Sequence, residues 1–231
     1  MLFIGIPTYD GKLHWTTAAG LVQTARLCGE KKIGIAVDVI PGDAFVSKAR
    51  NVIVHRFLKT QATDLLFIDA DVGFDAQGVI DLCKAEPPIV MGLYRMKTDD
   101  KVRFPALMHD PIIRHPSDRR LVKLQYGPAG FMRLRREVFE KMRDNWPDEY
   151  YVNAGAEPVF DYFPAGRHKN HFTGEDINFC QRAQVCGFDI WGMQDIALKH
   201  TGEKTFESNW AIDVLQVEES RHGDIKMAEV A

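Results

Sequence analysis

The chain has 231 residues, 45% of them hydrophobic, so it can bury a substantial core, and α/β units of this length often form a single domain. Its 29 basic and 32 acidic residues give a formal net charge of -3, which excludes a global positive field able to gather nucleic acid or an anionic membrane. We therefore expect one large domain with no nucleic-acid partner.

The cysteines and the opening residues bear on the compartment. Cys28, Cys83, Cys180 and Cys186 lie in apolar or helical contexts and form no CxxC pair, so we expect reduced core thiols rather than a zinc or dithiol site. Residues 1–7 have no basic lead and are too short for the core of a signal peptide, and no later apolar run approaches the length of a membrane span. These features favour a cytoplasmic protein without an integral membrane segment.

The first 95 residues alternate between strand and helix patterns. Short apolar runs bounded by turn formers predict buried strands at Leu2–Pro7, Ile33–Val39, Leu65–Asp69 and Ile89–Tyr94. Apolar residues at spacings of three and four predict a helix over Ala44–Thr60, and weaker patterns indicate helices at Thr17–Leu27 and Asp75–Ala85. Strands that alternate with helices imply βαβ crossovers, hence a largely parallel, Rossmann-like sheet with helices on both faces.

The second half has a different pattern, from which we expect a mixed sheet. Strands are predicted at Phe104–Met108, Leu121–Tyr126 and Phe131–Leu134, and helices at Arg136–Asn145 and Glu175–Cys186. Residues 150–173 are rich in Gly, Pro, Asn and aromatics without periodicity, which is long for a connection and predicts either a functional lid or a disordered insert. After Gly202 the chain turns polar, so residues 203–231 are predicted to be a C-terminal tail.

The strongest local signal is a pair of carboxylates after a predicted strand. The apolar residues Leu65 to Ile68 lead directly into Asp69 and Asp71, at the strand's carboxyl end, which is the edge where open α/β sheets bind ligands. Residues i and i+2 of an extended chain point the same way, so both carboxylates can address one divalent cation. Asp also commonly ends strands and caps helices, so the pair alone leaves a structural role open.

Two further elements carry candidate polar groups. Glu175 and Asp176 open a predicted helix, where acidic side chains also serve simply to complement the helix dipole. His200 follows the strand-like Ile196–Lys199, and a lone His at a strand end is commonly a packed or surface side chain. Imidazole nevertheless suits Mn²⁺, and one His joined to Asp and diphosphate oxygens makes a plausible octahedral ligand set.

Taken in order, these elements resemble the GT-A glycosyltransferases, in particular the inverting group similar to family 2. The resemblance covers residues 1–202 and rests on Ile4-Gly5-Ile6-Pro7-Thr8, Ala49-Arg50-Asn51, Asp69-Ala70-Asp71, Gly130-Phe131-Met132 with Arg135-Arg136-Glu137, Gly174-Glu175-Asp176 and His200. It implies a single Rossmann-like α/β domain of the GT-A type, with a mixed, mostly parallel central sheet flanked by helices. Residues 1–95 would be the nucleotide-binding half and 96–202 the acceptor half.

The resemblance also implies an activity and a site. It implies metal-dependent transfer of a sugar from a nucleotide diphosphate sugar to a glycan or other acceptor hydroxyl, with inversion, and Mn²⁺ or Mg²⁺ as the cofactor. Asp71 and His200 would bind the metal, Asp69 would contact the metal or the donor ribose, and Asp176 would be the general base. The implied nucleotide-sugar-binding residues are Pro7, Thr8, Tyr9, Asp38, Arg50, Asp69, Ala70, Asp71, Gly130 and Glu175.

Several of these residues are also explained by purely structural roles, and two other functions fit parts of the pattern. Asp38 is also explained as a turn carboxylate, Arg50 as a helix-surface charge and Gly130 as a hairpin residue. A noncatalytic nucleotide-sugar or carbohydrate-binding protein would keep every candidate residue. A haloacid-dehalogenase-type phosphatase also places DxD after an apolar strand, but Gly73 stands where its motif has Thr or Val.

Overall fold

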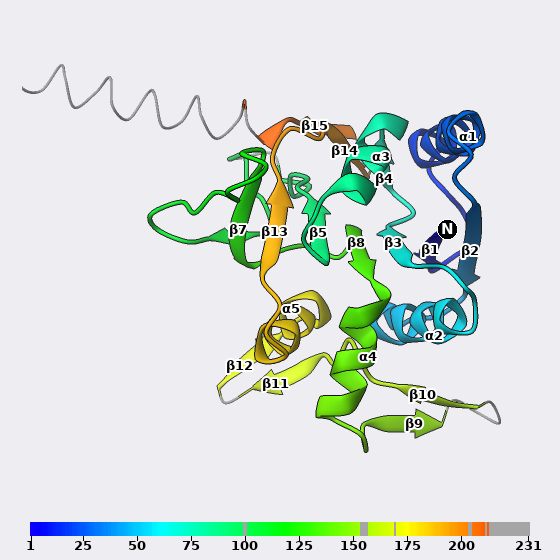
Figure 1. The fold of residues 1–231 in the computed structure, drawn as a ribbon, viewed down its shortest axis with the longest axis vertical. Coiled ribbons are helices and arrows are strands. Elements are labelled where there is room, and N and C mark those ends of the chain that lie inside the picture. The colour runs from blue at the N-terminus through cyan, green and yellow to red at the C-terminus, as the bar shows by residue number, and fades with distance from the viewer. Residues whose placement is uncertain (99–100, 153–156, 169, 203–204, 211, 213–231) are drawn as a thin grey trace, which may run out of the picture.

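The chain forms an α/β fold around one eight-stranded sheet (Figure 1). The computed structural model describes residues 1–98, 101–152, 157–168, 170–202, 205–210 and 212. In sheet order the strands are β2 (Ile35–Pro41), β1 (Leu2–Thr8), β3 (Asp64–Ile68), β8 (Phe131–Arg135), β5 (Ile89–Gly92), β13 (Ile190–Met193), β7 (Leu121–Tyr126) and β6 (Leu107–Met108). Only β7 and β8 run against the other strands of this sheet, so the predicted mixed, mostly parallel α/β sheet is confirmed.

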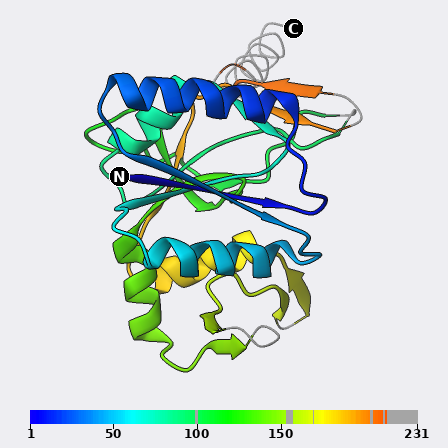
Figure 2. The same cartoon turned by 90° about the vertical axis from the view of Figure 1, so that its right-hand side faces the viewer.

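Helices cover both faces of this sheet, as the two perpendicular views show (Figures 1 and 2). On one face lie α1 (Trp15–Glu30) and α3 (Ala76–Lys84), and on the other lie α2 (Val46–Leu58), α4 (Arg136–Asn145) and α5 (Glu175–Val185). The first helix begins earlier than its apolar pattern predicts, because the ring Nδ1 of His14 accepts a hydrogen bond from the backbone N–H of Thr16 and caps it.

The central strands are buried on both faces because successive side chains of a strand point to opposite sides. In β3, Leu65 and Phe67 pack in the core beneath α2, α4 and α5, whereas Leu66 and Ile68 pack in the core beneath α1 and α3. Burial of each such side chain contributes about 1.5–3 kcal/mol. The apolar run therefore fixes where β3 ends, and so where the carboxylates that follow it emerge.

A small second sheet joins the chain just after these carboxylates to the end of the described chain. It has the order β15 (Thr205–Ser208), β14 (Leu198–Thr201), β4 (Val72–Phe74), and both of its pairings are antiparallel. The predicted boundary at residue 202 falls between β14 and β15, which pair with each other. His200, expected just after a strand, lies within β14.

The segment predicted as a lid, 150–173, contains two short hairpins. They are formed by β9 (Tyr150–Val152) with β10 (Pro158–Phe160), and by β11 (Gly166–His168) with β12 (His171–Thr173). Residues 153–156 and 169 of this segment lie outside the described residues. Between the hairpins, the buried Asn51 of α2 accepts hydrogen bonds from the backbone N–H groups of Tyr162 and Phe163, each at 3.0 Å. Tyr162 and Phe163 are themselves buried, so this part of the segment belongs to the core.

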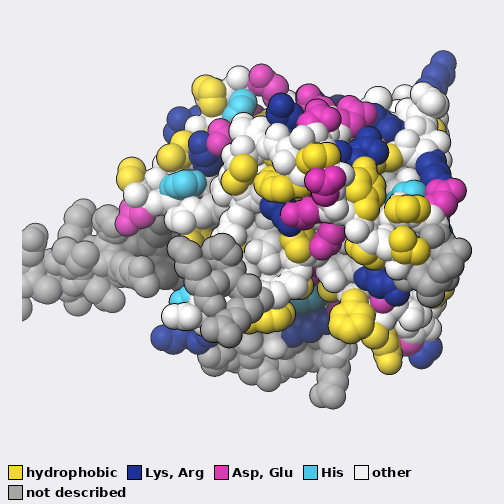
Figure 3. Space-filling view, turned by 90° about the horizontal axis from the view of Figure 1, so that it is seen from below, with side chains coloured by type: hydrophobic (Ala, Val, Ile, Leu, Met, Phe, Trp, Pro, Cys, Tyr) yellow, Lys and Arg dark blue, Asp and Glu magenta, His cyan; other side chains and the backbone are white. Residues whose placement is uncertain are grey.

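The surface and the thiols agree with the composition. On the face seen in Figure 3, basic and acidic side chains lie interspersed. All four cysteines are free, as expected, and burial raises the pKa of Cys83 and of Cys180 to about 12, so these thiols stay protonated. In the part of the chain that the structure describes, no helix combines the length and the apolar character that crossing a bilayer requires.

Candidate functional site

A cavity of about 610 Å³ opens at the carboxyl edge of the large sheet, beside the ends of β1 and β3. Seven of the residues expected to bind donor or metal line it, namely Pro7, Thr8, Tyr9, Asp69, Ala70, Asp71 and His200. Its volume falls in the range of ligand pockets. The cavity therefore lies at the edge of the sheet where Asp69 and Asp71 were expected to bind a ligand.

Asp71 and His200, which are distant in the sequence, meet at this cavity because β4 pairs with β14. The register places His200 opposite Val72, and the backbone N–H of Thr201 donates to the carbonyl oxygen of Asp71 at 2.9 Å. As a result, Nε2 of His200 lies 3.8 Å from Oδ1 of Asp71. The small sheet therefore sets the distance between the two expected metal ligands.

The imidazole of His200 is held in one orientation. Its Nδ1 lies 2.9 Å from the backbone oxygen of Arg95, and since a carbonyl only accepts, Nδ1 carries the proton and Nε2 presents its lone pair toward Asp71. The ring also makes an edge contact with Tyr94 at 4.8 Å between centroids. Burial lowers the pKa of His200, against the opposing effects of the Arg95 carbonyl and Asp71, which favours the neutral ring.

Arg50 lies beneath the cavity rather than in it. Only 3% of its side chain is exposed, and its guanidinium donates from Nη2 to Oδ1 of Asp69 at 2.8 Å and from Nη1 to Oε1 of Glu175. Burial alone would lower the pKa of Arg50, but the charges of Asp69 and Glu175 outweigh it and raise that pKa. Arg50 is thus neither a surface charge nor exposed to a donor; it ties the two acidic motifs together.

Gly130 packs directly against Asp69. The backbone N–H of Asp69 donates to the carbonyl of Gly130 at 2.8 Å. A Cβ on Gly130 would lie 2.3 Å from Oδ2 of Asp69 and 2.4 Å from Oη of the buried Tyr94. Since no side chain fits there, glycine is required for the close approach of backbone and carboxylate.

Asp176 stands at the start of α5, where its Oδ1 accepts a hydrogen bond from the backbone N–H of Ile177 at 2.8 Å. Burial and the neighbouring Glu175 raise the pKa of Asp176, although the Ile177 N–H and Arg50 act in the opposite direction. The charge of Asp176 acts on both Arg50 and Tyr94. The carboxylate thus belongs to the same electrostatic group as Asp69, although it does not line the cavity.

Asp38 lies elsewhere. Since β2 continues to Pro41, Asp38 sits in the middle of the strand rather than at its end, and its Oδ1 accepts from Nη1 of Arg56 on α2 at 3.0 Å. Asp38 does not line the cavity. Its carboxylate is instead the partner of a helix-surface arginine.

The donor chemistry of Asp71 and His200 fits a divalent cation bound in part by a substrate. A fixed neutral imidazole nitrogen and a carboxylate face each other, and the ammonium of Lys97 already contacts the second oxygen of Asp71. Asp69 is committed through Oδ1 to Arg50. Among the described residues no group of three His, Cys, Asp or Glu side chains converges as a metal site, so the remaining ligands would come from substrate or water.

The sequence patterns missed residues that loops bring to the site. Lys97 and Tyr94 follow the carboxyl end of β5, and Asp43, which follows β2, lines the cavity. One signal for them was available, because β5 is parallel to β3 and its carboxyl end lies at the same ligand-binding edge.

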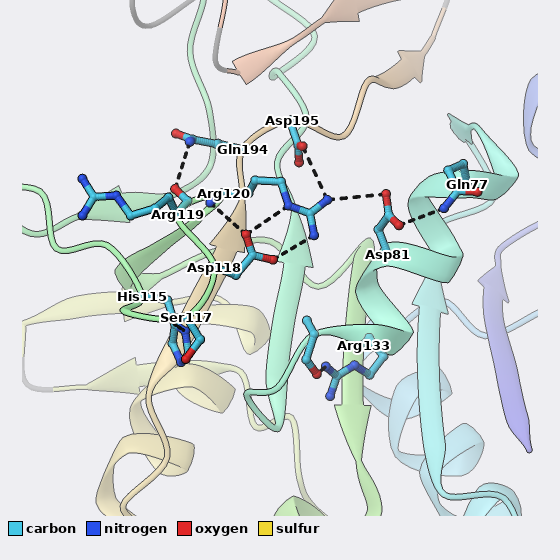
Figure 4. Close-up of polar contacts among 11 residues, drawn as sticks. Gln77, Asp81, His115, Ser117, Asp118, Arg119, Arg120, Arg133, Gln194 and Asp195 are labelled. Carbon is cyan, nitrogen blue, oxygen red and sulfur yellow. Dashed lines mark hydrogen bonds and ion pairs between the residues drawn. The ribbon is translucent and has the colours of Figure 1, made fainter.

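A second polar cluster, shown in Figure 4, is built around Arg120, which pairs with neighbouring carboxylates. Arg120 pairs in a bidentate fashion with Asp118, at 3.0 and 2.8 Å, and its Nη1 lies 3.6 Å from Asp81 of α3 and 3.7 Å from Asp195. Nearby, the fully buried Arg133 donates to backbone oxygens at the end of α3. These contacts tie α3 to the loops around β7 and β13, which is a structural role.

Comparisons with known proteins give likenesses of structure only. No family model and no curated protein sequence matches the chain. A Drosophila β1,4-galactosyltransferase 7 mutant in complex with manganese, UDP-Gal and xylobiose is 14% identical, with a TM-score of 0.46 over 90% of this chain and 71% of that one. A fragment of S. aureus TarS in complex with UDP is 17% identical, with a TM-score of 0.47 over 84% of this chain and 58% of that one.

A third structure, GalNAc-T7 with UDP, GalNAc and Mn²⁺, is 10% identical, with a TM-score of 0.47 over 84% of this chain. This chain spans only 42% of GalNAc-T7 and 58% of the TarS fragment. All of these TM-scores are below 0.5, so an account of what this chain does depends on its own residues.

Proposed function

We propose that this chain is a metal-dependent glycosyltransferase of the GT-A type that moves a sugar from a nucleotide diphosphate sugar to a glycan or other acceptor hydroxyl. One observation carries the proposal. The carboxylate of Asp71 and the free Nε2 of His200 face each other at 3.8 Å on the rim of a cavity large enough for a nucleotide. In the same proposal, residues 1–95 bind the nucleotide and residues 96–202 bind the acceptor, apart from His200, which joins Asp71 at the metal.

Asp71 and His200 would hold Mn²⁺ or Mg²⁺ together with the diphosphate of the donor. When bound, the cation supplies neutralisation of the negative charge that develops on the leaving diphosphate. The register of β4 and β14 fixes the two ligands before any ligand enters, and the Arg95 carbonyl fixes the imidazole. Asp69, whose Oδ1 is held by Arg50, would keep its remaining oxygen for the donor ribose or the metal.

Pro7, Thr8 and Tyr9 would hold the nucleoside. They follow one another at the carboxyl end of β1 and line the cavity, and Tyr9 is 76% exposed, which leaves its ring available for stacking. Ala70 lines the cavity between the two carboxylates. Gly130 and Glu175 act indirectly, Gly130 by leaving room for Asp69 and Glu175 by sharing Arg50 with it.

Asp176 would act as the general base. The acceptor oxygen forms its bond to the anomeric carbon while the bond from that carbon to the diphosphate oxygen breaks, and the acceptor proton passes to the Asp176 carboxylate. Attack from the face opposite the leaving group inverts the anomeric centre. A raised pKa brings this carboxylate closer to the acidity that suits a base near neutral pH.

The test starts with binding, because the base of the nucleotide is not specified by these contacts. Thermal unfolding is followed with uridine, guanosine, adenosine, cytidine and thymidine diphosphates, each with and without Mn²⁺. We expect one diphosphate to raise the melting temperature only with metal, and its sugar conjugates to support transfer. Metal-independent turnover that survives Asp71→Ala would refute the proposal.

A further inference from the structure

The contact between Lys97 and Asp71 is not explained by the roles assigned above. Lys97 lies on the loop that leaves β5, and its ammonium contacts Oδ2 of Asp71, whose other oxygen faces His200. Both side chains are partly exposed, 31% for Lys97 and 41% for Asp71. A positive charge from the chain itself therefore occupies one side of the carboxylate that is proposed to bind the metal.

The backbone around Lys97 is held in place, whereas its side chain is long and flexible. The preceding carbonyl of Arg95 binds His200, the N–H of Met96 donates to the oxygen of Arg103 at 2.7 Å, and Nη2 of Arg95 donates to the oxygen of Thr98 at 2.9 Å. An ammonium on a four-carbon stem can change partner without a change in the loop. The loop thus anchors a mobile charge beside the metal ligands.

The phosphates of a bound donor would be a second partner for the ammonium of Lys97. Arg50 is not available to them, because it is buried and bound to Asp69 and Glu175. A divalent cation bound at Asp71 would repel the ammonium of Lys97, and a diphosphate bound to that cation would bring phosphate oxygens within reach of the same side chain.

Building on the proposed function, we infer that Lys97 is an exchangeable cation: it occupies Asp71 in the ligand-free chain and transfers to the donor's phosphates when a metal takes Asp71. Lys97 is then a positioning residue for the donor. Its competition with the metal for Asp71 also couples the two events, because a diphosphate offers the displaced ammonium a new partner. A metal that binds without diphosphate breaks the ion pair between Lys97 and Asp71 and leaves the ammonium unpaired. When diphosphate binds as well, the displaced ammonium pairs with phosphate oxygens.

The test is Lys97→Met, which removes the charge and keeps a chain of similar length. Binding of Mn²⁺ alone is measured by electron paramagnetic resonance of the free ion. Binding of the preferred nucleoside diphosphate is measured by calorimetry at saturating Mn²⁺. We expect Mn²⁺ alone to bind about two- to fivefold more tightly, since a partly exposed ion pair no longer competes. We expect the diphosphate to bind roughly tenfold more weakly, since a charge-assisted contact is lost.

Lys101→Met is the matched control, because Lys101 is an exposed lysine of the same loop, whereas the ammonium that contacts Asp71 is that of Lys97, and it should leave both affinities unchanged. Opposite signs in Lys97→Met support the inference, because a merely structural role would weaken both affinities together. A fall in both, or no change in either, would overturn it while leaving the proposed function intact. If the wild-type chain binds no nucleoside diphosphate with Mn²⁺, the proposed function itself fails, and the inference with it.

Discussion

Nη2 of Arg50 lies 2.8 Å from Oδ1 of Asp69, and the same guanidinium contacts Glu175, so one buried cation joins the end of β3 to the start of α5. The two acidic motifs of the sequence thereby become one site. Without this guanidinium, Asp69 and Glu175 would repel each other, so Arg50 holds the site together before any ligand binds.

We expect Arg50→Met to lower the free energy of unfolding by about 2–4 kcal/mol, because two carboxylates lose a buried, charged hydrogen-bond donor while remaining partly solvated. Urea unfolding measures this loss. Arg56→Met is the control, since Arg56 pairs with Asp38 at the surface, where such pairs contribute up to about 1 kcal/mol. Equal losses in the two variants would show that Arg50 does not organise the site.

Gly130→Ala should damage the site through Asp69. The added Cβ would lie 2.3 Å from Oδ2 of Asp69, whose Oδ1 is held by Arg50, so the carboxylate must shift. A displacement of about 1 Å at such a group costs roughly 100-fold in transfer rate. Initial-rate measurements at saturating metal test this expectation.

Gly29→Ala is the matched control for Gly130→Ala, because a Cβ there meets nothing within 4 Å and the residue lies in α1. It should keep full activity and gain about 0.5–1 kcal/mol of stability. If Gly130→Ala retained wild-type rates as well, Asp69 would not be needed in its present position.

Asp176→Asn should separate activity from stability. Loss of the base is expected to slow transfer by roughly two to four orders of magnitude while the donor still binds. The pKa of Asp176 is raised in the folded chain above its ordinary value of 3.8, so its stabilising contribution is complete below that ordinary value and is lost as the pH rises through the folded pKa.

At neutral pH the ionised Asp176 therefore destabilises the fold, and Asp176→Asn should melt at a higher temperature than the wild type. This difference should shrink as the pH is lowered and disappear below the ordinary pKa. Calorimetric melting curves from acidic to neutral pH measure it. A variant that is less stable at neutral pH would contradict the raised pKa of Asp176, and a variant that transfers at the wild-type rate would remove Asp176 from the proposed role.

The fold was largely predictable because its strands carry a local signal. The continuous apolar runs of β1, β3 and β5 reflect burial on both faces, and the predicted helices over 136–145 and 175–186 match α4 and α5 to within one residue. By contrast, β4 and β13 were not predicted, and β6 has two residues where five were expected to form a strand. Short strands of this kind depend on their partners rather than on a pattern of their own.

The site was predictable only in part, for physical reasons that differ from residue to residue. Asp69 and Asp71 follow a strand whose end is fixed by its core, and both line the cavity. Asp38 was expected among the nucleotide-sugar-binding residues, but it does not line the cavity, because β2 runs three residues beyond it, to Pro41. Arg50 was assigned to the donor, since no pattern indicates that a helix arginine is buried under two carboxylates. Lys97 depends on a loop conformation without periodicity.

The central claim is that Asp71 and His200 bind one metal ion together with the donor diphosphate. The most direct test is pulsed electron paramagnetic resonance of Mn²⁺ bound to the chain with its preferred nucleoside diphosphate. We expect a nitrogen coupling from one imidazole in the wild type and its loss in His200→Gln, with phosphorus couplings retained in both. A wild-type spectrum with phosphorus couplings but no imidazole nitrogen would contradict the claim.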